Sequence, residues 1–361
     1  MNKLSKNKCL IASIGLTCLL IACSANINNN QKISNLVPAE NFDLRYWKVT
    51  LPSDEDHNGK IDEVGVKALQ TFTHPDYFHL DKNGHLVFTA PNKGTTTSSL
   101  AGTRSELRQM NRGLNKKVST HGPENNFTIA ANSHAKQFSS IGGKLNATLK
   151  VNAVSLRAGN PDKRPAYTVV VGQIHSGRIK GRPDGFGWGN QPIKIYYKKF
   201  PGHEKGSVFW NYERNLPITD PNKIDISYPI WGNTWVKNTD PGDVGISLGE
   251  AFSYEINVHE NMMHLTFQSE GHPNVEYSVD LSNNVDAYGK VDELDHPKGY
   301  SGDWNYFKAG AYNQCRTIEN APEFWHTACP GTGDWVTDEA NGDFTRVTFS
   351  QLVLSDSTPV M

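Results

Sequence analysis

Three short segments of the chain place charged and polar side chains at alternate positions, which is unusual for ordinary solvent-facing strands. The first is Arg104-Ser-Glu-Leu-Arg108, the second is Gln173-Ile-His175, and the third runs from Tyr306 to Gln314 with the sequence YFKAGAYNQ. They combine guanidinium, amide, imidazole and phenol groups. These groups can neutralise an anion, remove a proton and return one.

The spacing within the segments predicts a shared polar face, because successive side chains of a β-strand point to opposite sides. One face would collect Arg104, Glu106, Arg108, Gln173, His175, Tyr306, Lys308, Tyr312 and Gln314. The opposite face would collect Leu107, Ile174, Phe307, Ala309 and Ala311. The sequence therefore predicts three amphipathic strands with one reactive surface.

Elimination across C4 and C5 of a uronate requires the kinds of groups that these segments carry. Arg104 and Gln173 could neutralise the substrate carboxylate, which makes the C5 proton removable. His175 titrates in the range expected of a base. Tyr312 could protonate the departing O4 when cationic neighbours stabilise its phenolate form. This chemistry requires no cofactor.

The three segments resemble the signature motifs of the polysaccharide lyase family 7 alginate lyases, R-[ST]-E-[LV]-R, Q-[IV]-H and Y-F-K-x-G-x-Y-x-Q, in the same order and without departure. The resemblance implies an all-β fold, a β-jelly roll of two antiparallel sheets whose concave face binds alginate. It implies products that carry a 4-deoxy unsaturated uronate at the non-reducing end.

Residue roles follow from the same resemblance. Arg104 and Gln173 would neutralise the carboxylate and His175 would be the base. Tyr312 would be the acid, and it could also serve as the base for one of the two uronate epimers. The remaining motif residues would line the cleft and hold or orient substrate: Glu106, Arg108, Tyr306, Lys308 and Gln314.

Two features bear on specificity. Within this family, isoleucine at the middle position of the Gln-x-His motif, here Ile174, is associated with activity on guluronate or mixed blocks. Residues 176–210 and 215–249 add more sequence between the motifs than compact members of the resembled family need. Long loops beside a cleft could close one end of it. Closure would favour exolytic release of short products.

The elements that must position these groups are short strands. Six segments rich in β-branched and aromatic residues are bounded by Gly, Pro, Asn or Asp. They are 47–51, 86–89, 167–171, 254–258, 264–267 and 346–349. No long stretch has helical periodicity, so helix should be minor. We expect a single β-sandwich or jelly-roll domain over residues 41–361.

The N-terminal residues have the pattern of an export signal. A basic stretch precedes an apolar run over 10–21 that is shorter than a membrane span, and residues 20–23 read Leu-Ile-Ala-Cys. We expect a lipoprotein signal peptide over 1–22, a lipid on Cys23 and a flexible tether over 23–40. An ordinary signal peptide fits too. Either predicts export: lipid-anchored at the outer membrane or cell surface, otherwise periplasmic or secreted.

The cysteines fit an exported protein. Of five, Cys9, Cys18 and Cys23 lie in or next to the export segment, which leaves Cys315 and Cys329 for the folded part. Two thiols in an oxidising compartment predict one disulfide, and their spacing matches no zinc pattern.

The net charge of −1 argues against nucleic acid as a partner. A local cluster of cations could still bind an acidic polysaccharide such as alginate. We expect a monomer, attached to the membrane through the lipid on Cys23.

A second candidate site is an acidic loop that matches the start of a calcium-binding loop. Its matching residues are Asp54, Asp56, Asn58, Gly59 and Asp62. Position twelve, where a bidentate Glu belongs, is Gly65, although Glu63 is near. The pattern predicts a structural Ca²⁺, and a solvated acidic turn fits it as well.

Three other interpretations fit parts of the pattern. A glycoside hydrolase would need two carboxylates flanking the scissile bond, and Glu106 between two arginines should stay ionised. A carbohydrate-binding module would bind without turnover, which leaves His175 beside Tyr312 unexplained. A purely structural polar network predicts that substitutions lower stability and not only rate.

Overall fold

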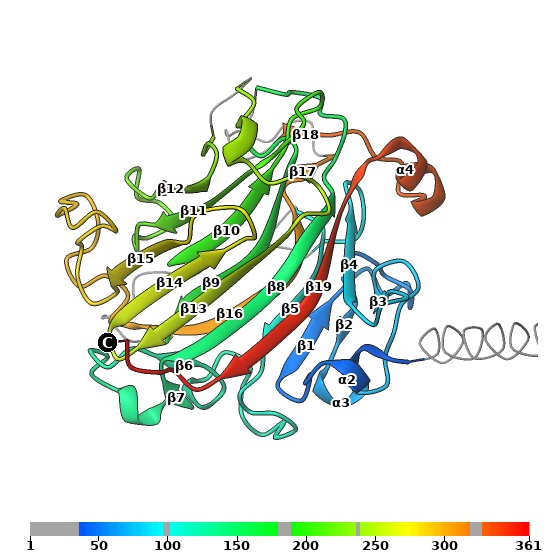
Figure 1. Ribbon diagram of the computed structural model, residues 1–361. Helices are drawn as coiled ribbons and strands as arrows, with labels where there is room; N and C mark the ends of the chain where they lie inside the picture. The colour runs from blue at the N-terminus through cyan, green and yellow to red at the C-terminus, as the bar shows by residue number, and fades with distance from the viewer. Residues whose placement is uncertain are drawn as a thin grey trace, which may run out of the picture.

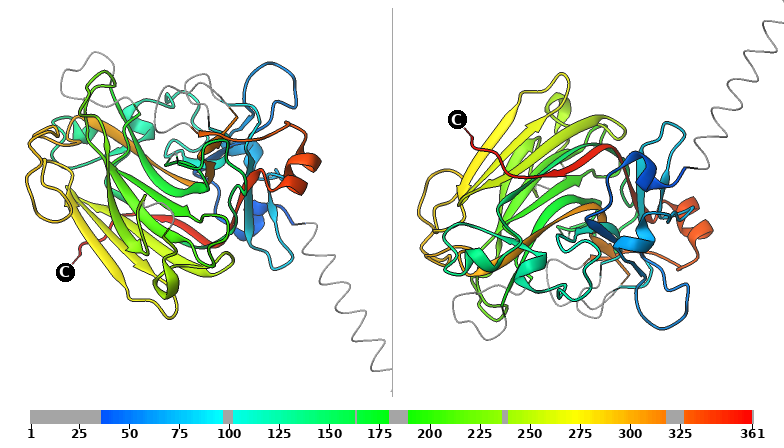
Figure 2. Two further views of the ribbon diagram at one scale, coloured as in Figure 1. Left: turned by 90° about the horizontal axis from the view of Figure 1, so that it is seen from above. Right: turned by 90° about the horizontal axis from the view of Figure 1, so that it is seen from below.

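The computed structural model describes residues 36–96, 102–162, 164–179, 189–235, 239–317 and 327–360. Within them the chain forms two large antiparallel sheets, which Figures 1 and 2 show as stacked, curved layers. The predicted signal peptide and Cys23 lie outside the described residues. Helix α2 (Pro38–Asn41) already includes the last three positions of the predicted tether.

The ten-stranded sheet carries the three motifs. Its strand order is β12 (Asp225–Trp231), β11 (Ser207–Glu213), β10 (Ile193–Lys198), β9 (Thr168–Arg178), β16 (Asp303–Asn313), β5 (Arg104–Gln109), β1 (Trp47–Thr50) and β2 (Glu63–Val64). Off this path, β6 (Phe127–Thr128) pairs with β16 and, in parallel, with β7 (Ser140–Ile141).

The seven-stranded sheet covers the other side of the core. Its order is β15 (Val275–Asp280), β14 (Met262–Gln268), β13 (Ala251–His259), β8 (Gly143–Ala153), β19 (Phe344–Ser355), β4 (Leu86–Pro91) and β3 (Phe78–Leu80). Figure 1 shows β19, in red, running through this layer.

Helices are few and short in the described part of the chain, as predicted. Besides α2 they are α3 (Val66–Leu69), α4 (Trp335–Asn341) and the 3-10 turns η1 (Pro123–Asn125), η2 (Ala135–Gln137) and η3 (Gly242–Val244). None of the helices in these described ranges is long and apolar enough to cross a membrane.

The core between the sheets is built from the alternate residues that the sequence predicts. Leu107, Ile174 and Phe307 are fully buried, as are Ala309 and Ala311, and all five belong to one cluster with residues of the opposite sheet such as Leu149 and Phe349. Burying one face of each motif strand fixes which side chains the other face presents, since a one-residue slip would reverse them.

The six predicted strand segments fall on β1, β4, β9, β13, β14 and β19. The prediction of long loops over residues 176–210 and 215–249 is wrong in part. The first range contains β10 and the start of β11, and the second contains β12. These strands extend the ten-stranded sheet beyond β9, because their apolar side chains Ile193, Ile195 and Val208 are buried in the core.

Cys315 and Cys329 form a disulfide, with Cα atoms 5.6 Å apart, within the usual range for this bond. The bond links β17 (Cys315–Arg316), which directly follows β16, to β18 (Thr327–Ala328), with which β17 pairs in parallel.

Candidate active site

The three motifs lie on neighbouring strands, with β16 between β5 and β9. The register places Tyr312 opposite Arg104, Lys308 opposite both Arg108 and Gln173, and Tyr306 opposite His175. The predicted polar residues therefore meet on the outward face of the ten-stranded sheet.

Two glycines permit this close packing. Gly310 has φ +148°, and a Cβ there would lie 2.4 Å from the Ser105 carbonyl oxygen. The register of β16 against β9 shifts at this point, between Ala309 and Tyr312. A Cβ on Gly102 would lie 2.6 Å from Cε2 of Tyr312. Side chains at either position would displace the strand or the ring, so glycine helps to place Tyr312.

Two cavities open over this face and share a wall made by Arg104, His175, Gly189 and Lys308. The larger cavity, of about 420 Å³, extends toward β10, β11 and β12. The smaller cavity, of about 260 Å³, extends toward β1 and β2. Because the two cavities extend in opposite directions from this shared wall, an extended ligand could occupy both and pass His175.

Glu106 is a buried carboxylate that contacts several of the polar side chains on this face. It is 2% exposed and lines neither cavity, which corrects the expectation that it lines the cleft. Its carboxylate accepts a hydrogen bond from Nε2 of Gln173 at 2.5 Å, forms an ion pair with Lys308, and lies 3.8 Å from Nη1 of Arg104. One buried anion thus orients three of the groups that face the ligand.

His175 is held as a neutral imidazole. Its Nδ1 lies 3.2 Å from the Ser176 carbonyl oxygen, which can only accept, so Nδ1 carries the proton and Nε2 carries the lone pair. Burial, followed by Lys308 and Arg104, lowers the pKa of His175 well below its ordinary value. At neutral pH the imidazole is therefore free to accept a proton at Nε2.

Tyr312 is surrounded by positive charge. The Arg104 guanidinium lies 4.2 Å from the centre of its ring. Burial alone would raise the pKa of Tyr312, but Arg104, Arg316 and Lys308 outweigh it, so the pKa falls below its ordinary value of 10. A phenol that ionises more readily is a better proton donor to a departing alkoxide.

Arg108 and Tyr306 shape the smaller cavity. The Arg108 guanidinium lies 3.9 Å from the centre of the Tyr306 ring, and it donates to the Thr120 carbonyl and to Oδ1 of Asn126, each at 2.9 Å. Tyr306 in turn stacks on His175, with ring centres 5.2 Å apart. These contacts fix the orientation of the imidazole.

The cavities also include residues that lie outside the three motifs. Lys48, His121 and Trp304 line the smaller one. Lys194, Lys223, Arg316, Glu213 and Asp225 line the larger one, together with the predicted Gln314. Lys194 is 2.9 Å from Asp225, and Lys223 pairs with Glu213. Alternation along residues 194–198 could have revealed Lys194, whereas Arg316 lies beyond the end of its motif.

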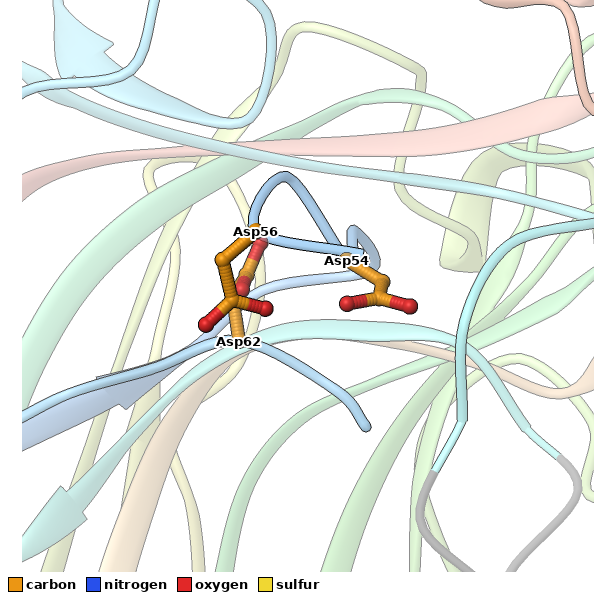
Figure 3. A group of neighbouring side chains, drawn as sticks. All are labelled: Asp54, Asp56 and Asp62. Atoms are coloured by element: carbon orange, nitrogen blue, oxygen red, sulfur yellow. The ribbon is translucent and has the colours of Figure 1, made fainter. Parts of the chain in front are cut away.

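The acidic loop places the Asp54, Asp56 and Asp62 carboxylates together, with one oxygen from each within 4.8 Å of the others (Figure 3). Asn58 lies beside them, but its amide donates to Asp56 at 2.7 Å and its Oδ1 accepts from the Lys60 N–H. Three carboxylates suit Ca²⁺, while Gly65 supplies no twelfth-position ligand. Calcium binding stays a prediction.

A two-sheet sandwich with a cationic open face, a neutral histidine and an acidified tyrosine defines a jelly-roll protein equipped for proton transfer on an acidic polysaccharide. Comparison with known proteins agrees. A family model described as alginate lyase matches residues 42–356. An alginate lyase from Klebsiella pneumoniae is 34% identical over 290 residues, covering 78% of this chain and 85% of that protein.

Solved structures give the same result. The crystal structure of the alginate lyase from Klebsiella pneumoniae matches with a TM-score of 0.69 and 29% identity, covering 90% of this chain and 99% of that one. An exolytic family 7 alginate lyase from Zobellia galactanivorans matches with a TM-score of 0.71, 33% identity and the same coverage. This chain belongs to the alginate lyases of polysaccharide lyase family 7.

Proposed function

We propose that this protein cleaves the 1,4-glycosidic bonds of alginate by β-elimination and leaves a 4-deoxy unsaturated uronate at the new non-reducing end. The observation that carries the proposal is the shared face on which a neutral His175 and a readily ionised Tyr312 flank Arg104. Family membership supports the same substrate class.

In the proposed reaction Arg104 and Gln173 hold the carboxylate of the uronate whose C5 proton is lost. Gln173 retains a second amide hydrogen for this contact, because the one known donation from Nε2 goes to Glu106. Stabilising the developing negative charge on the carboxylate lowers the barrier to proton removal.

His175 Nε2 then accepts the C5 proton, the C4–O4 bond breaks, and the C4=C5 double bond forms from the electron pair. Tyr312 donates its phenolic proton to O4, which leaves as a hydroxyl. Exchange with solvent returns the proton to Tyr312 and removes it from His175. Tyr312 would serve as base as well where the epimer presents its C5 proton from the other side.

The proposal includes exolytic action on guluronate or mixed blocks. Ile174 in the Gln-x-His motif supports the block preference, and the exolytic relative from Zobellia galactanivorans supports the mode. The segment between β11 and β12 contributes Ile218 and Ile224 to the larger cavity, where they could limit its length.

Product analysis tests the activity and the mode together. Polymannuronate and polyguluronate are digested separately, and unsaturated products are followed by ultraviolet absorbance and sized over time. The proposal expects short products from the first minutes, with faster release from polyguluronate. Binding of alginate without unsaturated product would favour a binding module instead.

We also propose that the protein is exported, lipid-anchored through Cys23 and monomeric. The signal-like N-terminus supports export, and the Cys315–Cys329 disulfide fits an oxidising compartment. Metabolic labelling with a radioactive fatty acid tests the anchor, because Cys23→Ser should remove the label and release the protein from membranes.

A further inference from the structure

Arg316 is a buried cation in the wall of the larger cavity. The residue is 9% exposed, yet its side chain lines the cavity together with Tyr312 and Gln314. It lies outside the three motifs, and the motif pattern assigns it no role.

The guanidinium of Arg316 has no hydrogen-bond acceptor or carboxylate among the described residues, and its buried Nε is unsatisfied. The lysines of the same cavity differ, because Lys194 pairs with Asp225 and Lys223 with Glu213. Leaving a buried charge without a partner costs stability. Such a group is expected where a ligand supplies the missing anion.

The backbone around Arg316 is fixed. The preceding residue, Cys315, is bonded to Cys329, and its N–H donates to Oδ1 of Asn313 at 2.9 Å. The Arg316 carbonyl accepts from the Cys329 N–H. A guanidinium on a fixed backbone loses less conformational entropy when it binds a carboxylate.

We propose that Arg316 binds the carboxylate of a second uronate in the larger cavity, next to the sugar whose carboxylate Arg104 and Gln173 hold. This inference rests on the proposed lyase function and adds a residue that makes the enzyme selective for consecutive uronates. A guanidinium suits this ligand, since it can donate two parallel hydrogen bonds to one carboxylate.

A second effect of Arg316 separates this role from a structural one. Burial raises the pKa of Tyr312, and the charge of Arg316 is, after that of Arg104, among those that lower it. Removing that charge should raise the pKa and move the alkaline limb of the rate profile to higher pH.

The test compares Arg316→Gln and Arg316→Lys with the matched control Arg45→Gln, whose arginine is exposed and pairs with Asp43 away from the cavities. Each is assayed on guluronate oligomers from dimer to pentamer, and binding of a tetramer is measured by calorimetry. Tm is recorded for each variant.

For Arg316→Gln we expect a KM for the tetramer and polymer about tenfold higher, equivalent to about 1.4 kcal/mol. The gain in kcat/KM on lengthening the substrate should shrink, and the alkaline limb of the pH–rate profile should move to higher pH. Tm should stay level or increase because a buried unpaired charge is gone. Arg316→Lys should recover part of the affinity.

Unchanged KM and tetramer affinity at every length would overturn the proposal, as would an equal loss in Arg45→Gln. A large fall in Tm with an unmoved pH profile would indicate a structural role instead. If the wild-type protein yields no unsaturated product, the lyase proposal fails, and calorimetry of the tetramer still decides whether Arg316 binds it.

Discussion

Glu106 offers the most informative perturbation, because one buried carboxylate faces two cations and an amide. In Glu106→Gln the volume is kept but the charge that Lys308 and Arg104 face is removed. Breaking a buried ion pair from one side costs about 3–5 kcal/mol. For a domain of this size each kcal/mol lowers Tm by roughly 2–4 °C, so we expect a fall of roughly 6 °C or more.

The same change should alter the chemistry in a defined direction. Glu106 raises the pKa of Lys308 and of Tyr312, so without it both groups should lose a proton at lower pH. The alkaline limb of activity should therefore move to lower pH, opposite to the shift expected for Arg316→Gln. The assay is thermal unfolding by circular dichroism combined with a pH–rate profile.

The control is Glu339→Gln. Glu339 also pairs with an arginine, Arg346, at 2.6 Å, but its side chain is 45% exposed. A pair in that setting contributes about 1 kcal/mol or less. If Glu106→Gln unfolds at the same temperature as Glu339→Gln and keeps its pH profile, the idea that Glu106 anchors the site is refuted.

Three further predictions concern single groups. Because the pKa of His175 is lowered, kcat/KM should hold as pH falls through 6.5 and be lost only below it, and an acid limb above 6.5 in a pH–rate profile would contradict this. Tyr312→Phe should reduce kcat by about 10²–10⁴-fold with little change in tetramer affinity by calorimetry, since it removes only the proton donor; an active variant would exclude Tyr312 as the acid. Ca²⁺ should raise Tm by differential scanning calorimetry without changing kcat, Asp56→Asn should abolish that rise, and an equal rise in the variant would locate the ion elsewhere.

The reactive face could be predicted because the side-chain period of a strand is exact. Ile174 and Leu107 had to be buried for the motifs to be strands, and that places His175 and Arg108 outward. Periodicity does not report depth, however. Glu106 and Tyr306 belong to the same face of the sheet, yet only Tyr306 lines a cavity, while Glu106 is buried under the neighbouring side chains.

The parts that could not be predicted depend on contacts between distant segments. Lys223 and Asp225 enter the larger cavity only because β12 pairs with β11 at the edge of the sheet. Arg316 enters it because the disulfide and β18 hold the chain after β16. The cysteine count predicts the disulfide, but the strand pairings that bring these side chains to the cavity have no local pattern in the sequence.

In the proposed mechanism His175 removes the C5 proton of a uronate. The direct measurement follows the ultraviolet absorbance of the C4=C5 unsaturated product on polyguluronate and polymannuronate, with wild-type protein and with a His175→Ala variant that is shown to be folded and to bind alginate. Rising absorbance is expected for the wild type and none for the variant. A variant that forms product at the wild-type rate would contradict it.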